Sequence, residues 1–213
     1  MQVHRGAVEV VVQAPAKLNL FFEVLAKRSD GYHEIETLMC PIDLYDTLYF
    51  RKVSSGRLEL ECQWGSPAGV SDQDGLGQVP QGSENLVVRA VELLRRRTGT
   101  EHGAALRLVK RIPVAAGLGG GSSDAAAALV AANLGWGLGL PISKLAVLAA
   151  ELGSDVPFFL VGGPAICRGR GEQVEPVSGL GSLSFVVVRP PEGLSTAAVY
   201  GVCRPAERPR CLE

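Results

Sequence analysis

A glycine-rich loop that leads directly into an alanine-rich segment most constrains what this chain can fold into. Residues 114–129 read VAAGLGGGSSDAAAAL, and they follow an alternating stretch at 104–112 that predicts a β-strand. Glycine reaches positive φ without strain and alanine is the best helix former, so the pattern predicts strand, loop and helix in that order. The helix is expected to run from about Ser123 to Asn133, and its small face at 125–128 favours close packing on a neighbour.

Such a loop is suited to holding phosphate groups. The N-terminus of a helix presents unpaired N–H groups and partial positive charge, which favour an anion. The hydroxyls of Ser122 and Ser123 add donors, and either can also meet a phosphate-bound Mg²⁺. The alternative interpretation is a glycine-rich turn capped by serine and aspartate. The position between a strand and a helix favours the phosphate site.

The loop fits neither of the common phosphate-binding fingerprints. The P-loop pattern G-x-x-x-x-G-K-[ST] requires a lysine after the glycines, and none follows here. The Rossmann pattern G-x-G-x-x-G/A requires glycine or alanine at its sixth place, which is Ser122 when counted from Gly117 and Asp124 when counted from Gly119. A loop of this kind must obtain its positive charge from a distant residue or from a metal ion.

The composition indicates an ordinary globular chain without a large charge bias. Of 213 residues, 46% are hydrophobic and 20% are charged, and the formal net charge is −1. This balance argues against nucleic acid or an anionic membrane as a partner. The five cysteines are scattered, so neither a zinc site nor a disulfide framework is expected, and a reducing cytoplasm is the simplest location. Neither a membrane span nor a signal peptide is expected.

Strands and helices alternate irregularly along the chain, which predicts an α+β fold rather than a doubly wound sheet. Apolar and β-branched stretches predict strands at 8–13, 18–26, 46–53, 56–64 and 184–190. Pro15 is expected to end the first of these, and a Ser-Ser-Gly turn is expected to pair 46–53 with 56–64. Polar, turn-rich stretches predict loops at 27–34 and 65–83. Helical spacing predicts helices at 83–99, between Ser83 as cap and Gly99 as stop, and from about Pro141 to Leu152.

Several stretches resemble one enzyme family in matching order. The segment PVAAGLGGGSSDAAAAL at 113–129 resembles the phosphate loop of the GHMP kinases, named for galactokinase, homoserine kinase, mevalonate kinase and phosphomevalonate kinase. Other stretches are similar to the members of this superfamily that act on 4-diphosphocytidyl-2-C-methyl-D-erythritol. They are APAKLNLFFEV (14–24), RSDGYHEIETLM (28–39), ENLVVRA (84–90) and ELGSDVPFFL (151–160). The resemblance runs from about Ala14 to Pro190.

The resemblance implies the N-terminal domain of this superfamily, whose fold is like domain 2 of ribosomal protein S5. We expect this ATP-binding domain at 1–165 and the start of a second, C-terminal domain at 166–213. The superfamily carries a further G-[TS]-G motif near its C-terminus, and this sequence has none, so most of the second domain is expected to be missing. The surviving part is then expected to expose an apolar patch.

The resemblance also implies an activity. The chain is expected to transfer the γ-phosphate of ATP, with Mg²⁺ as a further cofactor, to the 2-hydroxyl of the methylerythritol unit, a small molecule linked to cytidine diphosphate. Lys17 and Asp155 fall on the family's catalytic pair. A carboxylate can accept the proton of the attacking hydroxyl, and a lysine can neutralise charge on the transferred group. Whether Asp155 removes the proton or orients the hydroxyl stays open, as do the metal ligands and the oligomeric state.

The family's binding residues carry over to named positions. ATP is expected to contact Asn85, near the adenine, and the loop residues Pro113, Val114, Ala115, Ala116, Gly117, Leu118, Gly119, Gly120, Gly121, Ser122 and Ser123. The cytidine substrate is expected to contact Asn19, Tyr32, His33 and Thr196. A tyrosine face can stack on a pyrimidine ring, and a histidine can meet the edge of the base. Two alternatives remain, namely an inactive, truncated nucleotide-binding paralogue and a different small-molecule kinase of the superfamily.

Overall fold

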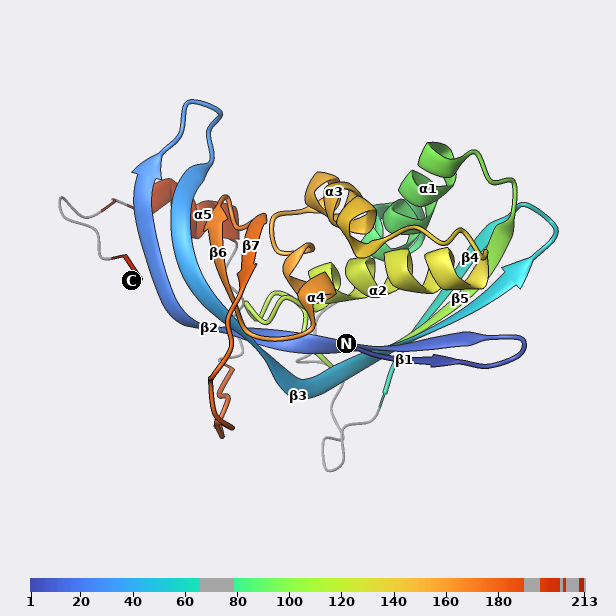
Figure 1. Ribbon diagram of the computed structural model, residues 1–213, viewed down its shortest axis with the longest axis horizontal. Coiled ribbons are helices and arrows are strands. Elements are labelled where there is room, and N and C mark those ends of the chain that lie inside the picture. The colour runs from blue at the N-terminus through green and yellow to red at the C-terminus, as the bar shows by residue number, and fades with distance from the viewer. Residues whose placement is uncertain (66–78, 190–195, 204, 206–210, 213) are drawn as a thin grey trace.

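The computed structural model of the chain describes residues 1–65, 79–189, 196–203, 205 and 211–212 (Figure 1). Its strands are β1 (Gln2–Arg5), β2 (Val10–Lys27), β3 (His33–Val53), β4 (Leu58–Trp64), β5 (Gly103–Lys110), β6 (Ala165–Gly169) and β7 (Gln173–Pro176). Its helices are the 3₁₀ helix η2 (Gly82–Glu84), α1 (Leu86–Thr98), α2 (Gly120–Gly135), α3 (Ile142–Leu152), α4 (Phe158–Val161) and α5 (Thr196–Val202). Helices α1, α2 and α3 gather on one face of the sheet, and the predicted α+β class is confirmed.

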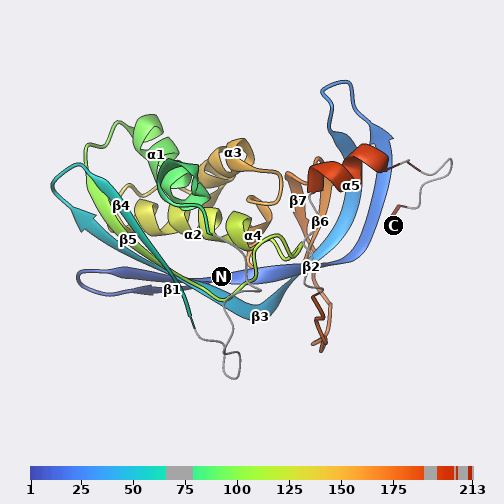
Figure 2. The same ribbon diagram turned by 180° about the vertical axis from the view of Figure 1, so that it is seen from behind.

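The described strands form a seven-stranded sheet that is antiparallel except at one pair. Its order is β1-β2-β3-β5-β4, and β6 pairs with β3 and with β7. The parallel pair is β4 with β5. Strands β2 and β3 form a long hairpin, with register shifts after Pro15, Asn19 and Val24. Such shifts bend a hairpin, and Figures 1 and 2 show its curled end rising beside α5 and β6.

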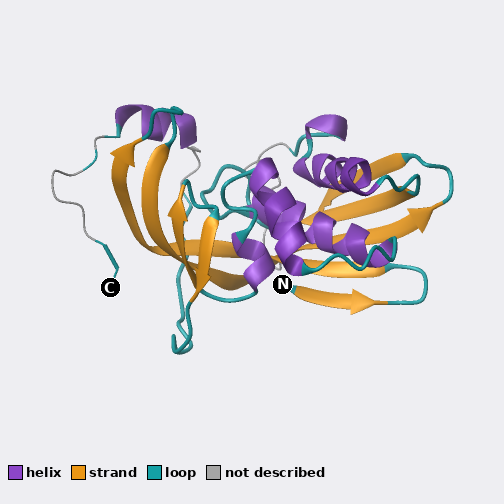
Figure 3. Ribbon diagram, turned by 45° about the horizontal axis from the view of Figure 1, so that its top comes forward, coloured by secondary structure: helices purple, strands orange, loops and turns teal. Residues whose placement is uncertain are grey.

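The alanine-rich helix α2 packs between the sheet and helices α1 and α3, and Figure 3 shows the helices lying across the strands. Residues 125–128 are fully buried, which confirms the predicted close-packing face. The C-terminal end of α2 is equally tight. A Cβ at Gly135 would lie only 2.3 Å from Cε1 of Phe50, whose ring packs edge-on against Trp136 with centroids 5.7 Å apart.

Helix α1 begins later than Ser83 predicted. Its N-cap is Asn85, whose side chain accepts a hydrogen bond from the Val87 N–H, whereas Ser83 lies in η2. Asn85 satisfies one of the free N–H groups of the first turn, which Ser83 is too far away to reach. Gly99, at φ 70°, ends α1 as predicted.

Helix α2 begins earlier than its serines predicted. Gly119, at φ 71°, is its N-cap, and Ser122 and Ser123 lie inside the first turn rather than at the cap. Glycine adopts this left-handed conformation without a steric penalty, so it can turn the chain directly into the helix.

Three of the strand predictions are wrong. Pro15 does not end a strand, because the register shift between Pro15 and Ala16 accommodates the missing N–H within β2. The stretches 46–53 and 56–64 do not pair, since β5 lies between β3 and β4 and pairs with both. Residues 184–189 form no strand with any described residue, and residue 190 lies outside the described part. The predicted loop at 27–34 is confirmed as the turn between β2, which ends at Lys27, and β3, which begins at His33. Residues 66–78 of the other predicted loop are not described.

The stretch before residue 190 exposes large apolar side chains, and the apolar patch for a second domain stays a prediction. Its large apolar side chains are between 41% and 93% exposed, and they are Leu180, Leu183, Phe185, Val186, Val187 and Val188. The predicted domain boundary after residue 165 falls at the start of β6, which pairs with β3 of the main sheet. That boundary stays a prediction.

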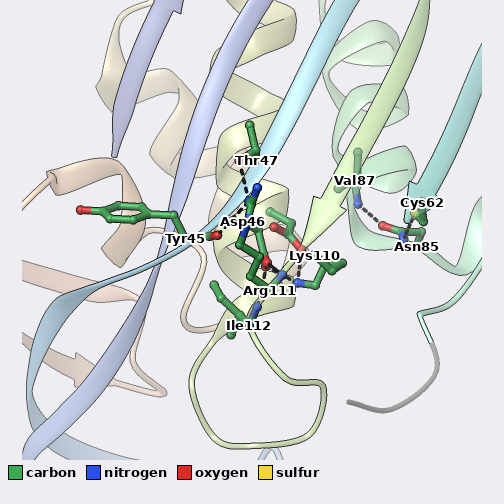
Figure 4. A network of polar contacts seen from close by, with 10 residues as sticks. Tyr45, Asp46, Thr47, Cys62, Asn85, Val87, Lys110, Arg111 and Ile112 are labelled. Atoms are coloured by element: carbon green, nitrogen blue, oxygen red, sulfur yellow. Dashed lines mark hydrogen bonds and ion pairs between the residues drawn. The ribbon is translucent and has the colours of Figure 1, made fainter. Parts of the chain in front are cut away.

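A buried ion network joins β3, β5 and α2 (Figure 4). Lys110, the last residue of β5, contacts the carboxylates of Asp46 on β3 and Asp124 on α2, and its Nζ lies 2.7 Å from Oδ2 of Asp124. The other oxygen of Asp46 accepts hydrogen bonds from the backbone N–H groups of Arg111 and Ile112, the second at 2.9 Å. The three charged residues are at most 3% exposed. Two carboxylates therefore share one ammonium out of contact with water.

The burial of two carboxylates with one ammonium changes the pKa of Asp124. Burial raises the pKa of Asp124 to about 7, against the attraction of Lys110 and with a further contribution from Asp46. The Oδ1 atom of Asp124 has no hydrogen-bond partner in the described part of the chain. Protonation of Asp124 would remove the second buried negative charge.

The contact between Gly135 and Phe50 predicts a specific loss of stability. In Gly135→Ala the new methyl group must displace the buried ring, which costs about 1–3 kcal/mol and outweighs the gain of about 1 kcal/mol in helix propensity. Urea denaturation should show a lower free energy of unfolding. The matched control is Gly121→Ala, whose Cβ would lie 3.6 Å from Cδ1 of Leu86, an ordinary contact. Equal stability of the two variants would contradict the prediction.

The raised pKa of Asp124 predicts an unusual pH dependence of stability. Because the folded-state pKa of about 7 lies above the ordinary aspartate pKa of 3.8, the folded chain binds more protons than the unfolded chain in the window between these two pH values. This group therefore makes the free energy of unfolding fall as pH rises through the window. An asparagine amide does not titrate, so the stability of Asp124→Asn relative to the unmodified chain should increase between about pH 5 and about pH 8.

Urea denaturation at both pH values measures this difference. The control is Asp43→Asn, which removes a carboxylate that accepts a hydrogen bond from Tyr45 at an exposed position. Its relative stability should change little with pH. A relative stability of Asp124→Asn that is constant or falls with pH would show that Asp124 does not titrate in this way.

Candidate active site

A cavity of about 990 Å³ brings together the phosphate loop, β2, the β2–β3 turn and α5. The residues predicted to be catalytic, Lys17 and Asp155, both line it. So do Asn19, Tyr32 and His33, which the resemblance assigns to the substrate. Segments that are far apart in the sequence thus share one cavity.

The phosphate loop forms one wall of this cavity. Every residue from Pro113 to Ser122 lines it, whereas Ser123 is fully buried and its Oγ has no hydrogen-bond partner in the described part of the chain. Gly117, Gly119 and also Ala115 have positive φ values of 72°, 71° and 56°. These left-handed residues let the loop turn sharply before α2 begins.

Lys17 lies against the loop and brings positive charge to a loop that carries none. Its backbone N–H donates to the carbonyl oxygen of Leu118 at 2.9 Å. Glycine at position 119 makes room for the lysine side chain, because a Cβ there would lie 2.9 Å from Cγ of Lys17 and 2.9 Å from Cζ of Phe159. The loop and the lysine are therefore held together by the backbone and by close packing.

Lys17 and Asp155 form an ion pair in the cavity. Nζ of Lys17 lies 3.8 Å from Oδ2 of Asp155, which is longer than a hydrogen bond and leaves the carboxylate, 31% exposed, as an acceptor for a ligand. Burial lowers the pKa of the Lys17 ammonium, and the Asp155 carboxylate opposes this effect. The ammonium also donates a hydrogen bond to Oδ1 of Asn19 at 2.5 Å.

A chain of hydrogen bonds fixes Asn19. Its Nδ2 donates to Oγ1 of Thr37 at 2.8 Å, and that hydroxyl donates to the carbonyl oxygen of Phe21 at 2.7 Å. Both ends of the Asn19 amide are therefore engaged, and one of them holds the Lys17 ammonium. Thr37, fully buried, was missed by the sequence analysis, because a threonine within RSDGYHEIETLM carries no signal of its own.

Aromatic side chains gather on the other side of the cavity. Tyr200 of α5 stacks on His33, with ring centroids 5.0 Å apart and planes inclined by 25°. The guanidinium of Arg170 lies 4.6 Å from the centre of the Tyr32 ring. Burial raises the pKa of Tyr200, and the Asp155 carboxylate adds to this rise.

Tyr200 and Arg170 were also missed by the sequence analysis. Tyr200 follows Thr196 at the i, i+4 spacing that puts two residues on one helix face, and this spacing was the available signal. Thr196 begins α5, and its side chain lies outside the described part.

Asn85 lines the cavity, yet its amide is used by the fold (Figure 4). Its Oδ1 accepts from the Val87 N–H at 2.9 Å, and its Nδ2 donates to the carbonyl oxygen of Pro80 at 2.9 Å and lies 3.7 Å from Sγ of Cys62. Asn85 therefore shapes the wall of the cavity through the start of α1.

The described residues lack both a metal-binding cluster and a membrane-spanning helix. They contain no cluster of three or more His, Cys, Asp or Glu side chains that could hold a metal ion. None of their helices combines the length and the apolar character that crossing a membrane requires.

Comparisons with known proteins identify relatives of this chain. Residues 85–163 match the family described as GHMP kinases N terminal domain. The chain is 48% identical over 201 residues to 4-diphosphocytidyl-2-C-methyl-D-erythritol kinase of Pelotomaculum thermopropionicum, covering 94% of this chain and 66% of that protein. It is 50% identical over 198 residues to the enzyme of the same name from a Synechococcus strain, covering 92% of this chain and 60% of the relative. The chain thus spans about three fifths to two thirds of these relatives.

Solved structures extend the likeness to the fold. A crystal structure of 4-(cytidine 5'-diphospho)-2C-methyl-D-erythritol kinase matches with a TM-score of 0.62 and 41% identity, over 78% of this chain and 55% of that chain. The mevalonate kinase of Methanococcus jannaschii matches in fold, with a TM-score of 0.59 and 16% identity over 83% of this chain and 57% of that chain. The chain therefore belongs to the GHMP kinase superfamily and, within it, to the family of the 4-diphosphocytidyl-2-C-methyl-D-erythritol kinases.

Proposed function

We propose that this chain uses ATP to phosphorylate the 2-hydroxyl of 4-diphosphocytidyl-2-C-methyl-D-erythritol. One observation carries the proposal: Lys17 and Asp155 meet between the phosphate loop and the aromatic cluster of the same cavity. A phosphoryl donor on the loop and a cytidine-linked acceptor on the aromatic side would then meet at this pair. The names of the relatives support the same substrate.

In this proposal the loop and the start of α2 bind the phosphates of ATP. Helix α2 has 16 residues, and its first N–H groups and positive end face the loop that lines the cavity. Gly117, Gly119 and Gly120 leave the backbone accessible to phosphate oxygens. Mg²⁺ would neutralise charge on the phosphates when bound, with the half-buried Ser122 hydroxyl as a ligand from this chain.

The catalytic step assigns separate roles to Lys17 and Asp155. The acceptor oxygen forms a bond to the γ-phosphorus as the bond from that phosphorus to the β,γ-bridging oxygen breaks, and ADP leaves. Asp155 orients the acceptor hydroxyl and receives its proton. Lys17, held by Asn19, stabilises the charge on the transferred group.

The aromatic side of the cavity is proposed to bind the cytidine of this small-molecule substrate. The rings of Tyr32, His33 and Tyr200 offer faces on which a pyrimidine can stack, and Arg170 adds positive charge beside Tyr32. Thr196, at the start of the same helix as Tyr200, stays a proposed substrate contact. The proposal includes a cytoplasmic location, where ATP is available.

The roles of the catalytic pair predict a large loss of turnover. In Asp155→Asn the proton acceptor is removed, so kcat for ADP release with 4-diphosphocytidyl-2-C-methyl-D-erythritol should fall by about 10²- to 10⁴-fold. Lys17→Met should lower kcat comparably, since a buried charge next to the transferred group is lost. A coupled assay of ADP release measures both variants.

Matched controls remove the same charges elsewhere. Asp43→Asn changes an exposed carboxylate, and Lys52→Met changes an exposed lysine that contacts His102. Both should keep the unmodified turnover. Unchanged turnover of Asp155→Asn would refute its role, and ATP binding without turnover in the unmodified chain would favour the inactive paralogue.

The aromatic cluster predicts selective loss of cytidine affinity. In His33→Ala, removal of one stacked ring should weaken competition by CDP about tenfold, because base–aromatic stacking contributes about 1–3 kcal/mol. The affinity for ATP should not change. His4→Ala, on the exposed strand β1, is the control. Unaltered CDP competition in His33→Ala would favour a different small-molecule kinase of the superfamily.

A further inference from the structure

The buried ion network lies at both ends of the phosphate loop. At the entrance, the Asp46 carboxylate accepts hydrogen bonds from the N–H groups of Arg111 and Ile112, immediately before Pro113. At the exit, Lys110 connects Asp46 to Asp124 in the first turns of α2. The Asp46 side chain therefore binds the residues before the loop directly (Figure 4). It is connected to α2, which follows the loop, through the Lys110 ammonium.

The start of α2 rests directly on this network. A Cβ at Gly120 would lie 2.9 Å from Cγ2 of Ile112 and 3.2 Å from Nζ of Lys110. The first residue of α2 thus has no room for a side chain between the Lys110 ammonium and Ile112, whose N–H donates to the Asp46 carboxylate. A shift of Lys110 or Ile112 would move the N–H groups that open the helix.

Stability alone is a poor explanation for such a network. Removing three charged side chains from water is costly, and buried ion pairs are often matched by apolar residues of similar volume. Asp46 is 0% exposed, and both of its oxygens are used, one by the cation and one by two backbone N–H groups. Its position fits a role in fixing the geometry of the loop.

We propose that Asp46 is a positioning residue for nucleotide binding, which holds the entrance of the phosphate loop and, through Lys110, the first turn of α2. The proposal rests on the proposed ATP site and adds to it a residue that lies outside the cavity lining. Asp46 reaches the cavity through the backbone that it fixes and through Lys110, which lines the cavity.

The test compares two ligands that use opposite sides of the cavity. In Asp46→Ala the loss of a carboxylate bonded to two N–H groups should weaken ATP binding, measured by calorimetry, about tenfold or more, with CDP binding changed less than about twofold. Asp46→Asn keeps an oxygen for Arg111 and Ile112 but loses the charge that faces Lys110. It should bind ATP with intermediate affinity, and it is nearly isosteric, so it serves if the alanine variant does not fold.

Hydrogen exchange supplies a readout without any ligand. In either Asp46 variant the amides of Arg111, Ile112 and the first turn of α2 should exchange faster than in the unmodified chain. The matched control is Glu36→Gln, since Glu36 is another buried carboxylate of β3, paired with Arg168 and with the Leu212 N–H. It should alter neither the exchange of these amides nor the affinity for ATP.

The outcomes separate this proposal from the proposed function. Equal weakening of ATP and CDP in the Asp46 variants, or an equal loss of ATP affinity in Glu36→Gln, would overturn the positioning role. Unchanged ATP affinity in the Asp46 variants would also overturn it and leave the proposed ATP site intact. If the Asp46 variants exchange faster at the loop but the unmodified chain binds no ATP, the proposed function is overturned. The structural role of Asp46 in fixing the loop is then still supported.

Discussion

The hydrogen bond from the Lys17 N–H to the Leu118 carbonyl is the contact on which the arrangement of the cavity depends. It fastens a loop between β5 and α2 to the middle of β2, a strand from the other end of the domain. Backbone groups make this bond, so the bond itself does not require lysine at position 17. The lysine is explained by its side chain, which passes Gly119 and ends beside Asp155. The backbone of Lys17 therefore holds the loop in place, and its side chain faces Asp155 in the cavity.

The two buried lysines of the loop region differ in what their charge can still do. Lys110 is surrounded by two carboxylates, so the network leaves no positive charge for a ligand. Lys17 has one carboxylate at 3.8 Å and one neutral amide, so part of its field extends into the cavity. The same residue type thus fixes the loop in one place and attracts anions in the other.

Local signals predicted what local interactions determine. The glycines of the loop and the alanines of α2 have strong intrinsic preferences for turn and helix, so the sequence alone predicts them. Gly99 ends α1 because glycine readily adopts the left-handed conformation found there. Contacts between distant segments carry no such signal: nothing in the sequence pairs Asp46 with Lys110 or sets Tyr200 on His33. Lys17 and Asp155 were found because a family resemblance supplied the missing distance information. The sequence did not predict that β5 lies between β3 and β4, because a short turn between two apolar stretches ordinarily makes a hairpin.

That separation has a consequence for how the chain acquires its fold during synthesis. Strand β3 is complete at Val53, but the strand that covers its edge, β5, begins only at Gly103. Until then β4 is the nearest apolar strand, and an antiparallel pairing of β3 with β4 is the local competitor of the native sheet. The native order requires β5 to lie between β3 and β4, which is possible only after α1 has been synthesised. Emergence of β5 from the ribosome therefore sets the earliest moment at which the loop that follows it can take its place beside Lys17.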